Sequence, residues 1–353
     1  MKTYLQRFLI FAAFTTTAIG CHTPSTTHQA DFVIDLFPKK KEYHLGDTLV
    51  VRMLHPTFEG EIEKIDYQVH RNTLISVGDT VILASLPLGK QYLKVSVQMT
   101  NGKTYTAQKE FLLLAKEAPK LYHYQILNEY AHDPNAYTQG LEFVGDTLVE
   151  STGQYAESTI RKWNPFTGEV YKNVPLQPMY FGEGATVFGG KILQLTWREQ
   201  VGFVYDAQLN LQKTFKYNKS KEGWGLCHNG NNKLYKSDGT EKIWLLHPET
   251  FAEIDSLQLC TNKSMYSYAN ELEFANGKIY ANTFLKDGIM IINPENGAIE
   301  GVVDVRGLKE KVTKTEKVDV LNGIAYHPVR KTFFITGKNW DKIFEVVFTP
   351  ANP

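Results

Sequence analysis

Alternation of apolar and polar residues is the main pattern along the chain, and it predicts strands. In residues 31–115, the run from Leu93 to Met99 places every second side chain on an apolar face, and Asn101-Gly102 after it is a strong hairpin turn. No helical period competes with this alternation. We therefore expect residues 31–115 to form a small immunoglobulin-like β-sandwich. The segment has no cluster of His, Cys or acidic residues, so we interpret it as a spacer or docking module.

The strand pattern repeats over residues 121–350. Each repeat begins with small or acidic residues, continues as an apolar strand and a turn, and ends with a second strand that finishes in polar or aromatic residues. The equivalent positions are Gly140, Gly184, Gly225, Glu271 and Gly323. Four strands in roughly 40–50 residues are typical of a β-propeller blade. With the strand at 121–132 completing the last blade, we expect an all-β chain with a five-bladed propeller after the linker 116–120.

The N-terminus has the features of an export signal. Residues 1–20 combine an early basic segment with an apolar run and end in small or apolar residues just before Cys21. This segment resembles a bacterial lipoprotein signal with lipidation at Cys21; an ordinary cleaved signal is the alternative. Residues 21–30 read as a polar tether. We therefore expect an extracytoplasmic lipoprotein, facing the periplasm or carried on the outer membrane.

The charge balance and the cysteines narrow the function classes. Lys+Arg and Asp+Glu both number 38, so no basic field favours nucleic-acid binding. Hydrophobic residues make up 42% and aromatic residues 12%, as in a folded globular protein. Cys227 and Cys260 can pair in an oxidising compartment or stay as free buried thiols, and the sequence leaves both possibilities.

The repeat starts carry the candidate chemistry, because the innermost strands of a propeller begin near its central channel. The residues expected to converge there are Tyr137, Gln139, Glu183, Trp224, Asn270, Glu271 and Asn322, together with Trp197, Phe284 and Lys338 at the ends of second strands. Each residue alone has an ordinary structural explanation, but their recurrence at matched positions favours a pocket. Gly182 and Gly184 flank Glu183, and we interpret them as room for another molecule to approach the carboxylate.

Eight short motifs in a fixed order give the chain a family resemblance. They are YTQGLEF, ESTGQY, YFGEG, EGWGL, SDGT, NELEF, LNGIAY and TGKNW, over about residues 122–348. In this order they resemble the plant-type glutaminyl-peptide cyclotransferases, a family with a five-bladed propeller. The resemblance implies that Glu183 is catalytic. It places the substrate pocket on Gln139, Phe181, Trp197, Trp224, Asn270 and Lys338, with Phe284 where the family usually has Trp.

The implied reaction is cyclisation of an N-terminal glutamine to pyroglutamate with loss of ammonia. One carboxylate can act as base and then as acid, which suits Glu183, and Lys338 can stabilise the developing oxyanion. The substrates would be peptides or proteins with N-terminal Gln, and the protein a monomer without cofactor. The histidines show no metal-ligand spacing, although an ion in the channel stays possible. The alternatives are a propeller that only binds peptides or sugars and a metal-dependent lactonase-like hydrolase.

Overall fold

The computed structural model describes residues 32–351, and it is built almost entirely from strands. The expected signal segment, Cys21 and the polar tether lie outside the described residues. The one helical element in the described part is the short 3₁₀ turn Lys309–Lys311, so the all-β prediction is confirmed. Between residues 32 and 351 no helix is long and apolar enough to cross a membrane.

The N-terminal region consists of two sheets that share one core. The first sheet has the order β1-β3-β7-β6, and its strands are β1 (Val33–Phe37), β3 (Thr48–Leu54), β7 (Thr80–Ile82) and β6 (Ser76–Val77). The second has the order β2-β9-β8-β4-β5, and its strands are β2 (Tyr43–His44), β9 (Thr104–Leu114), β8 (Gly89–Met99), β4 (Ile62–Val69) and β5 (Asn72–Thr73). Alternate residues of β8, from Leu93 to Met99, are buried in the shared core, as the alternation predicts. The immunoglobulin-like assignment of this sandwich stays our interpretation.

Three four-stranded antiparallel sheets follow along the chain. The first contains β11 (Thr138–Val144), β12 (Thr147–Thr152), β13 (Thr159–Trp163) and β14 (Val170–Pro175). The second contains β15 (Gly182–Phe188), β16 (Lys191–Thr196), β17 (Val201–Tyr205) and β18 (Leu211–Lys216). The third contains β19 (Leu226–His228), β20 (Leu234–Ser237), β21 (Lys242–Leu246) and β22 (Glu253–Gln258).

An eight-stranded sheet completes the C-terminal region. One half contains β23 (Ala269–Ala275), β24 (Lys278–Thr283), β25 (Gly288–Ile292) and β26 (Ile299–Asp304); the other contains β27 (Leu321–His327), β28 (Thr332–Gly337), β29 (Lys342–Pro350) and β10 (Lys120–Ala131). Strand β10 pairs antiparallel with β29 and, over Lys120–His123, parallel with β26. A strand from before the first repeat thus completes the last set of four, which is the pairing expected for residues 121–132.

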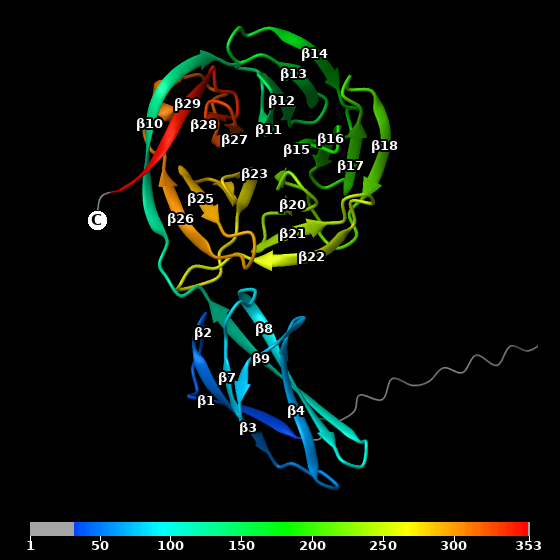
Figure 1. Cartoon of the computed structure of the whole chain (residues 1–353). Helices are drawn as coiled ribbons and strands as arrows, with labels where there is room; N and C mark the ends of the chain where they lie inside the picture. Colours follow the sequence, from blue (N-terminus) through cyan, green and yellow to red (C-terminus); the bar gives the residue numbers. More distant parts are fainter. Residues whose placement is uncertain (1–31, 352–353) are drawn as a thin grey trace, which may run out of the picture.

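The five sets of four strands form a closed ring (Figure 1). The innermost strands contact one another in the order β11, β15, β19, β23 and β27, and β27 contacts β11 again. Strands β14, β18 and β22 lie on the outside of the ring. We interpret each set as one blade of the predicted propeller, because this places the start of every repeat at the central channel.

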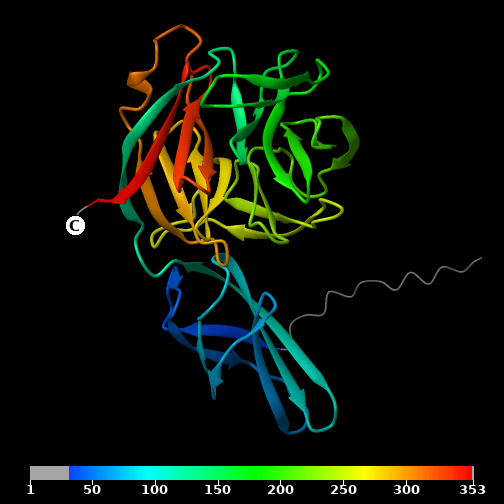
Figure 2. The ribbon, with the colours of Figure 1, turned by 45° about the horizontal axis from the view of Figure 1, so that its top comes forward.

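The sandwich packs against the rim of the ring and does not cover its opening (Figures 1 and 2). Cys260 and Ala298 of the ring belong to the same buried cluster as the sandwich core. The backbone N–H of Leu88 donates to the carbonyl of Asn296 at 3.0 Å. Cys260 is therefore buried between the two parts, and both it and Cys227 are free thiols in the structure.

Candidate active site

The polar residues at the repeat starts lie at irregularities of the innermost strands. The pairing register with the second strand shifts at Gln139 in β11, Glu183 in β15, Asn270 in β23 and Asn322 in β27. Such shifts bend a strand and turn a side chain away from the regular pleat. In this way, polar residues on different strands are brought to one end of the central channel.

A cavity of about 430 Å³ at this end of the channel is lined by all the residues that the family resemblance implied for catalysis and substrate binding. Its lining consists of Tyr137, Gln139, Gln154, Phe181, Glu183, Trp197, Arg198, Glu222, Trp224, Tyr268, Asn270, Phe284 and Lys338. Two residues expected to converge with them, Glu271 and Asn322, are buried and do not line this cavity. Glu271 accepts hydrogen bonds from the backbone N–H groups of Leu141 and Ile324, and Nδ2 of Asn322 donates to Oε1 of Gln139.

Glu183 is the buried carboxylate of the cavity. Its Oε1 accepts a hydrogen bond of 2.9 Å from Nε2 of Gln139, whereas its Oε2 is buried without a partner among residues 32–351. Burial raises the pKa of Glu183 well above its ordinary value; the positive charge of Lys338 opposes this shift, and the negative charges of Glu222 and Glu199 add to it. A carboxylate with a raised pKa and one unpaired oxygen is suited to exchange a proton with a bound molecule.

The glycines around Glu183 have a different role from the one the sequence suggested. A Cβ on Gly184 would lie 2.4 Å from the carbonyl oxygen of Trp224, and one on Gly182 would lie 2.5 Å from that of Thr152. These glycines are needed because neighbouring backbones approach closely. The interpretation that they make room for a ligand is therefore wrong, although the carboxylate between them does face the cavity.

Lys338 supplies the positive charge of the cavity. It follows the end of β28, is 3% exposed, and places Nζ 4.7 Å from the ring centre of Tyr137 and 5.6 Å from that of Phe284. Burial lowers the pKa of Lys338, and the negative charges of Glu183 and Asp319 oppose that shift. The hydroxyl of Tyr137 donates to Asp319 at 3.1 Å, which holds its ring beside the ammonium.

Aromatic rings form the walls of the cavity. Phe181 packs against Trp197 with ring centres 5.5 Å apart, and Trp224 packs against Phe284 at 5.3 Å. A Cβ on Gly153 would lie 2.4 Å from the ring of Phe181, so this glycine makes room for that wall. The walls give the cavity an apolar lining in which a small amide-bearing group can be held away from water.

Sequence reasoning missed Glu222, which holds two of these walls in place. Its Oε2 accepts hydrogen bonds from the indole N–H groups of Trp197 at 2.7 Å and Trp224 at 2.9 Å. Burial alone would raise the pKa of Glu222, but the hydrogen bonds from Trp224, Trp197 and Arg198 outweigh it and hold the pKa below its usual value. The only sequence signal was its position two residues before Trp224 in the EGW motif.

Glu222→Ala is expected to raise the KM for the implied Gln-initiated peptide by about 30-fold, because both indoles lose their acceptor and each hydrogen bond contributes about 1 kcal/mol. Glu222→Gln should keep KM near the wild-type value, since an amide oxygen can accept both bonds. Both variants remove a negative charge near Glu183 and should lower its pKa. The acidic limb of the pH profile, where kcat/KM increases with pH as Glu183 ionises, should therefore move to lower pH in both. Steady-state kinetics across pH measures the two effects; an unchanged KM in Glu222→Ala would contradict this role.

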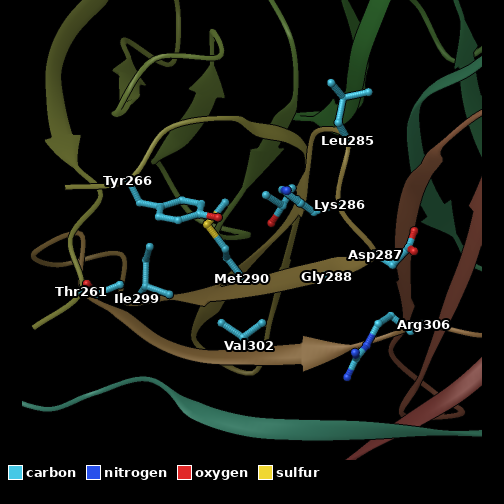
Figure 3. Close-up of a pocket in the computed structure, with 11 residues that line it drawn as sticks. Thr261, Tyr266, Leu285, Lys286, Asp287, Gly288, Met290, Ile299, Val302 and Arg306 are labelled. Carbon is cyan, nitrogen blue, oxygen red and sulfur yellow. The ribbon is translucent and has the colours of Figure 1, made fainter. Parts of the chain in front are cut away.

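A second cavity of about 460 Å³ lies beside the first, next to β25 and β26 (Figure 3). Apolar side chains of Met290, Ile299 and Val302 contribute to its lining, and it contains neither Glu183 nor Lys338. Thr283 and Leu285 line this cavity, whereas Phe284 between them lines the first. The segment 283–285 therefore separates the two cavities, and the candidate chemistry belongs to the first.

Comparisons with known proteins identify the family of this chain. A family model described as Glutamine cyclotransferase matches residues 94–348. A curated glutaminyl-peptide cyclotransferase from Arabidopsis thaliana is 37% identical over 232 residues, which cover 65% of this chain and 72% of the relative. The crystal structure of Myxococcus xanthus glutaminyl cyclase matches with a TM-score of 0.61 and 34% identity, covering 66% of this chain and 100% of that one.

The family match extends further than the motifs suggested. The motifs begin near residue 122, but the match begins at residue 94 inside β8 and includes all of β9. The last strands of the sandwich are thus part of the matched region. The chain belongs to the glutamine cyclotransferase family.

Proposed function

We propose that the chain is a glutaminyl-peptide cyclotransferase that converts the N-terminal glutamine of peptides to pyroglutamate and releases ammonia, with Glu183 as the proton-transfer group. The observation that carries this proposal is the buried Glu183 with its unpaired Oε2 in a cavity that also holds Lys338. Membership of the family and the name of the Arabidopsis relative support the same activity.

The reaction needs one proton to be moved between two nitrogen atoms. The substrate's neutral α-amine attacks its own side-chain amide carbon, so a C–N bond forms and the carbonyl oxygen becomes an oxyanion. Glu183 Oε2 takes a proton from the attacking nitrogen and returns it to the side-chain nitrogen. The bond to that nitrogen then breaks and ammonia leaves, which balances the reaction with no other reactant.

Three other groups of the cavity support this step. The ammonium of Lys338 offers a positive charge to the oxyanion. The side-chain amide of Asn270 is 3% exposed and forms no hydrogen bond with another residue of the described part, so it is available to the substrate. The aromatic walls exclude water and hold the glutamine side chain folded back toward its own amine.

The direct test is to incubate the protein with a short peptide that begins with glutamine and to measure ammonia and the matching mass loss. The same peptide with an acetylated N-terminus is the control, because its blocked amine cannot attack. Ammonia release from the free peptide alone supports the proposal. A protein that only binds peptides would retain the free peptide, the acetylated peptide or both, and would release no ammonia from either.

Chelation separates the cyclotransferase from a metal-dependent hydrolase. In the part of the chain that the structure describes, no group of three or more His, Cys, Asp or Glu residues is arranged to hold a metal ion. EDTA or a zinc-selective chelator should therefore leave the initial rate unchanged. A loss of activity that zinc restores would support the hydrolase, and a loss that only calcium restores would indicate a structural ion.

The location of the protein is part of the same proposal. Lipidation at Cys21 would anchor a monomer to a bacterial membrane outside the cytoplasm, where the catalytic ring meets exported peptides or proteins with N-terminal Gln. The polar segment 21–30 would separate the anchor from the sandwich. Metabolic labelling with a fatty acid, compared between the wild type and Cys21→Ala, tests this.

A further inference from the structure

A chain of buried side-chain amides leads to Glu183 from the interior of the channel. Nδ2 of Asn322 donates to the backbone carbonyl of Thr138 and to Oε1 of Gln139, both at 2.9 Å. Nε2 of Gln139 in turn donates to Oε1 of Glu183 at 2.9 Å. Asn322 is fully buried and does not line the cavity.

The orientation of each amide follows from the backbone. A carbonyl only accepts, so the NH₂ group of Asn322 must face Thr138. The same NH₂ group reaches Gln139, which must therefore present its oxygen to Asn322. Only then does the NH₂ group of Gln139 face Glu183. A reversed Gln139 would place its oxygen against a carboxylate oxygen.

A buried atom without a partner shows that this orientation has a cost. Oδ1 of Asn322 is buried without a partner among the described residues. Nδ2 of Asn282 is a second such atom but lies outside the amide chain, since Asn282 accepts through Oδ1 from the backbone N–H of Gly323 at 2.9 Å. An unsatisfied buried polar atom is rare in a folded protein and calls for a compensating role.

We propose that Asn322 is a positioning residue that, through Gln139, directs a hydrogen bond onto Oε1 of Glu183 and leaves Oε2 facing the substrate. The inference rests on the proposed function, in which Glu183 moves the proton. Asn322 would not touch the substrate. It would determine which carboxylate oxygen is free and keep that oxygen at one place in the cavity.

The amide chain also favours the ionised form of Glu183, since a donor on Oε1 stabilises a carboxylate. The other titratable or charged groups around it are Lys338, Glu222, Glu199, Arg198, Tyr137, Tyr155 and Tyr217. The pKa values of the three tyrosines are raised, so they stay neutral through the pH range of the reaction. Loss of the Gln139 donor should therefore move the titration of Glu183 to higher pH.

The test is the pH profile of full-length Asn322→Leu with a short Gln-initiated peptide. Its acidic limb of kcat/KM is expected to lie about one pH unit above that of the wild type, with kcat on the plateau reduced about tenfold. Asn282→Leu is the matched control. It removes an equally buried amide that forms no hydrogen bond with Gln139 or Glu183, so it should lower the melting temperature without moving the limb.

A double-mutant cycle separates positioning from a general structural effect. In a Gln139→Leu background the amide chain has no link to Glu183, so adding Asn322→Leu should produce no further shift of the limb. An unmoved limb in folded Asn322→Leu, or an equal further shift in the double variant, would overturn the proposal. If Asn322→Leu does not fold, the near-isosteric Asn322→Asp takes its place and should also move the acidic limb to higher pH.

A measurement that does not depend on turnover separates a failure of this proposal from a failure of the proposed function. The carboxyl stretching band of Glu183 in infrared difference spectra, assigned by comparison with Glu183→Gln, titrates whether or not ammonia is released. If the wild type releases no ammonia, the proposed function fails. If ammonia is released but Asn322→Leu leaves the titration of this band unchanged, only the role of Asn322 fails.

Discussion

Glu183→Gln is expected to lower kcat by about 10²–10⁴, the usual contribution of a positioned proton-transfer group, while the protein stays folded. Glutamine keeps the shape of the side chain, and its oxygen can still accept the hydrogen bond that Gln139 donates. The change removes a buried carboxylate whose Oε2 has no partner in the described structure, so no native hydrogen bond is lost there. Single-turnover and steady-state assays of ammonia release measure the effect.

Glu271→Gln is a matched control for this variant. Glu271 is also fully buried beside the channel, but both of its oxygens accept backbone hydrogen bonds and it does not line the cavity. An amide there would turn its NH₂ group toward a backbone N–H, so stability should fall by about 1–3 kcal/mol while kcat stays close to wild type. Near-normal turnover of Glu183→Gln at every pH would remove Glu183 from the mechanism.

The pH profile gives a second test of Glu183. The base must be ionised, and burial raises its pKa well above the ordinary value of 4.5. Activity should therefore increase with pH along an acidic limb that lies above the usual range of glutamate. The part of this limb that belongs to Glu183 should be absent from the residual activity of Glu183→Gln, which keeps only the part set by the substrate's α-amine, because that amine must be neutral to attack.

The members of the cavity could be predicted from the sequence because a repeat places equivalent residues at equivalent depths. Gln139, Glu183, Trp224, Asn270 and Asn322 each directly precede an aligned repeat position, and the structure brings the first four into the cavity. The end of a second strand lies at the same side of the ring, which is why Trp197, Phe284 and Lys338 join them. Periodicity was sufficient for these residues, whereas Phe181 was placed in the pocket only by the family resemblance.

The supporting contacts could not be predicted in the same way. Glu222 and Tyr268 lie between repeats, where no periodic pattern assigns a direction to the side chain. The shifts of register at Glu183 and Asn322 are local departures from a period of two, so the same alternation is compatible with their presence or absence. The role of Gly184 was misjudged for a related reason, because the atom that it accommodates belongs to Trp224, on the next repeat.

The sequence pattern also could not predict where the sandwich packs against the ring. Alternation in β8 indicates which of its side chains face a core, but Cys260 and Ala298 of the ring complete that core from far along the chain. The loop that follows β22 therefore packs against the sandwich near Cys260 and lines the cavity at Tyr268. A contact between two domains depends on surfaces that neither domain's own periodicity describes.

Lys338→Met is expected to lower kcat by about 10²–10³, the cost of removing one preorganised group that stabilises an oxyanion. Methionine is similar in length and apolar, so it can occupy the space between the rings of Tyr137 and Phe284. The variant also leaves Glu183 without its positive neighbour, and the pKa of Glu183 should rise further. The acidic limb is therefore expected to move to higher pH, opposite to its movement in Glu222→Gln.

The two consequences of Lys338→Met separate on the plateau above the acidic limb. There Glu183 is ionised in both proteins, so a loss that acts only through its pKa would disappear, whereas a loss of oxyanion stabilisation would remain. Asp319→Asn is the matched control, because asparagine can still accept the hydrogen bond from Tyr137 while its negative charge is gone. The negative charge of Asp319 opposes the lowering of the pKa of Lys338, so this pKa should fall in Asp319→Asn. Only the basic limb, where activity decreases at high pH as Lys338 loses its proton, should then move, and it should move to lower pH. Full recovery of kcat in Lys338→Met at high pH would restrict Lys338 to an electrostatic influence on Glu183, whereas a persistent deficit would place its ammonium against the reacting carbonyl.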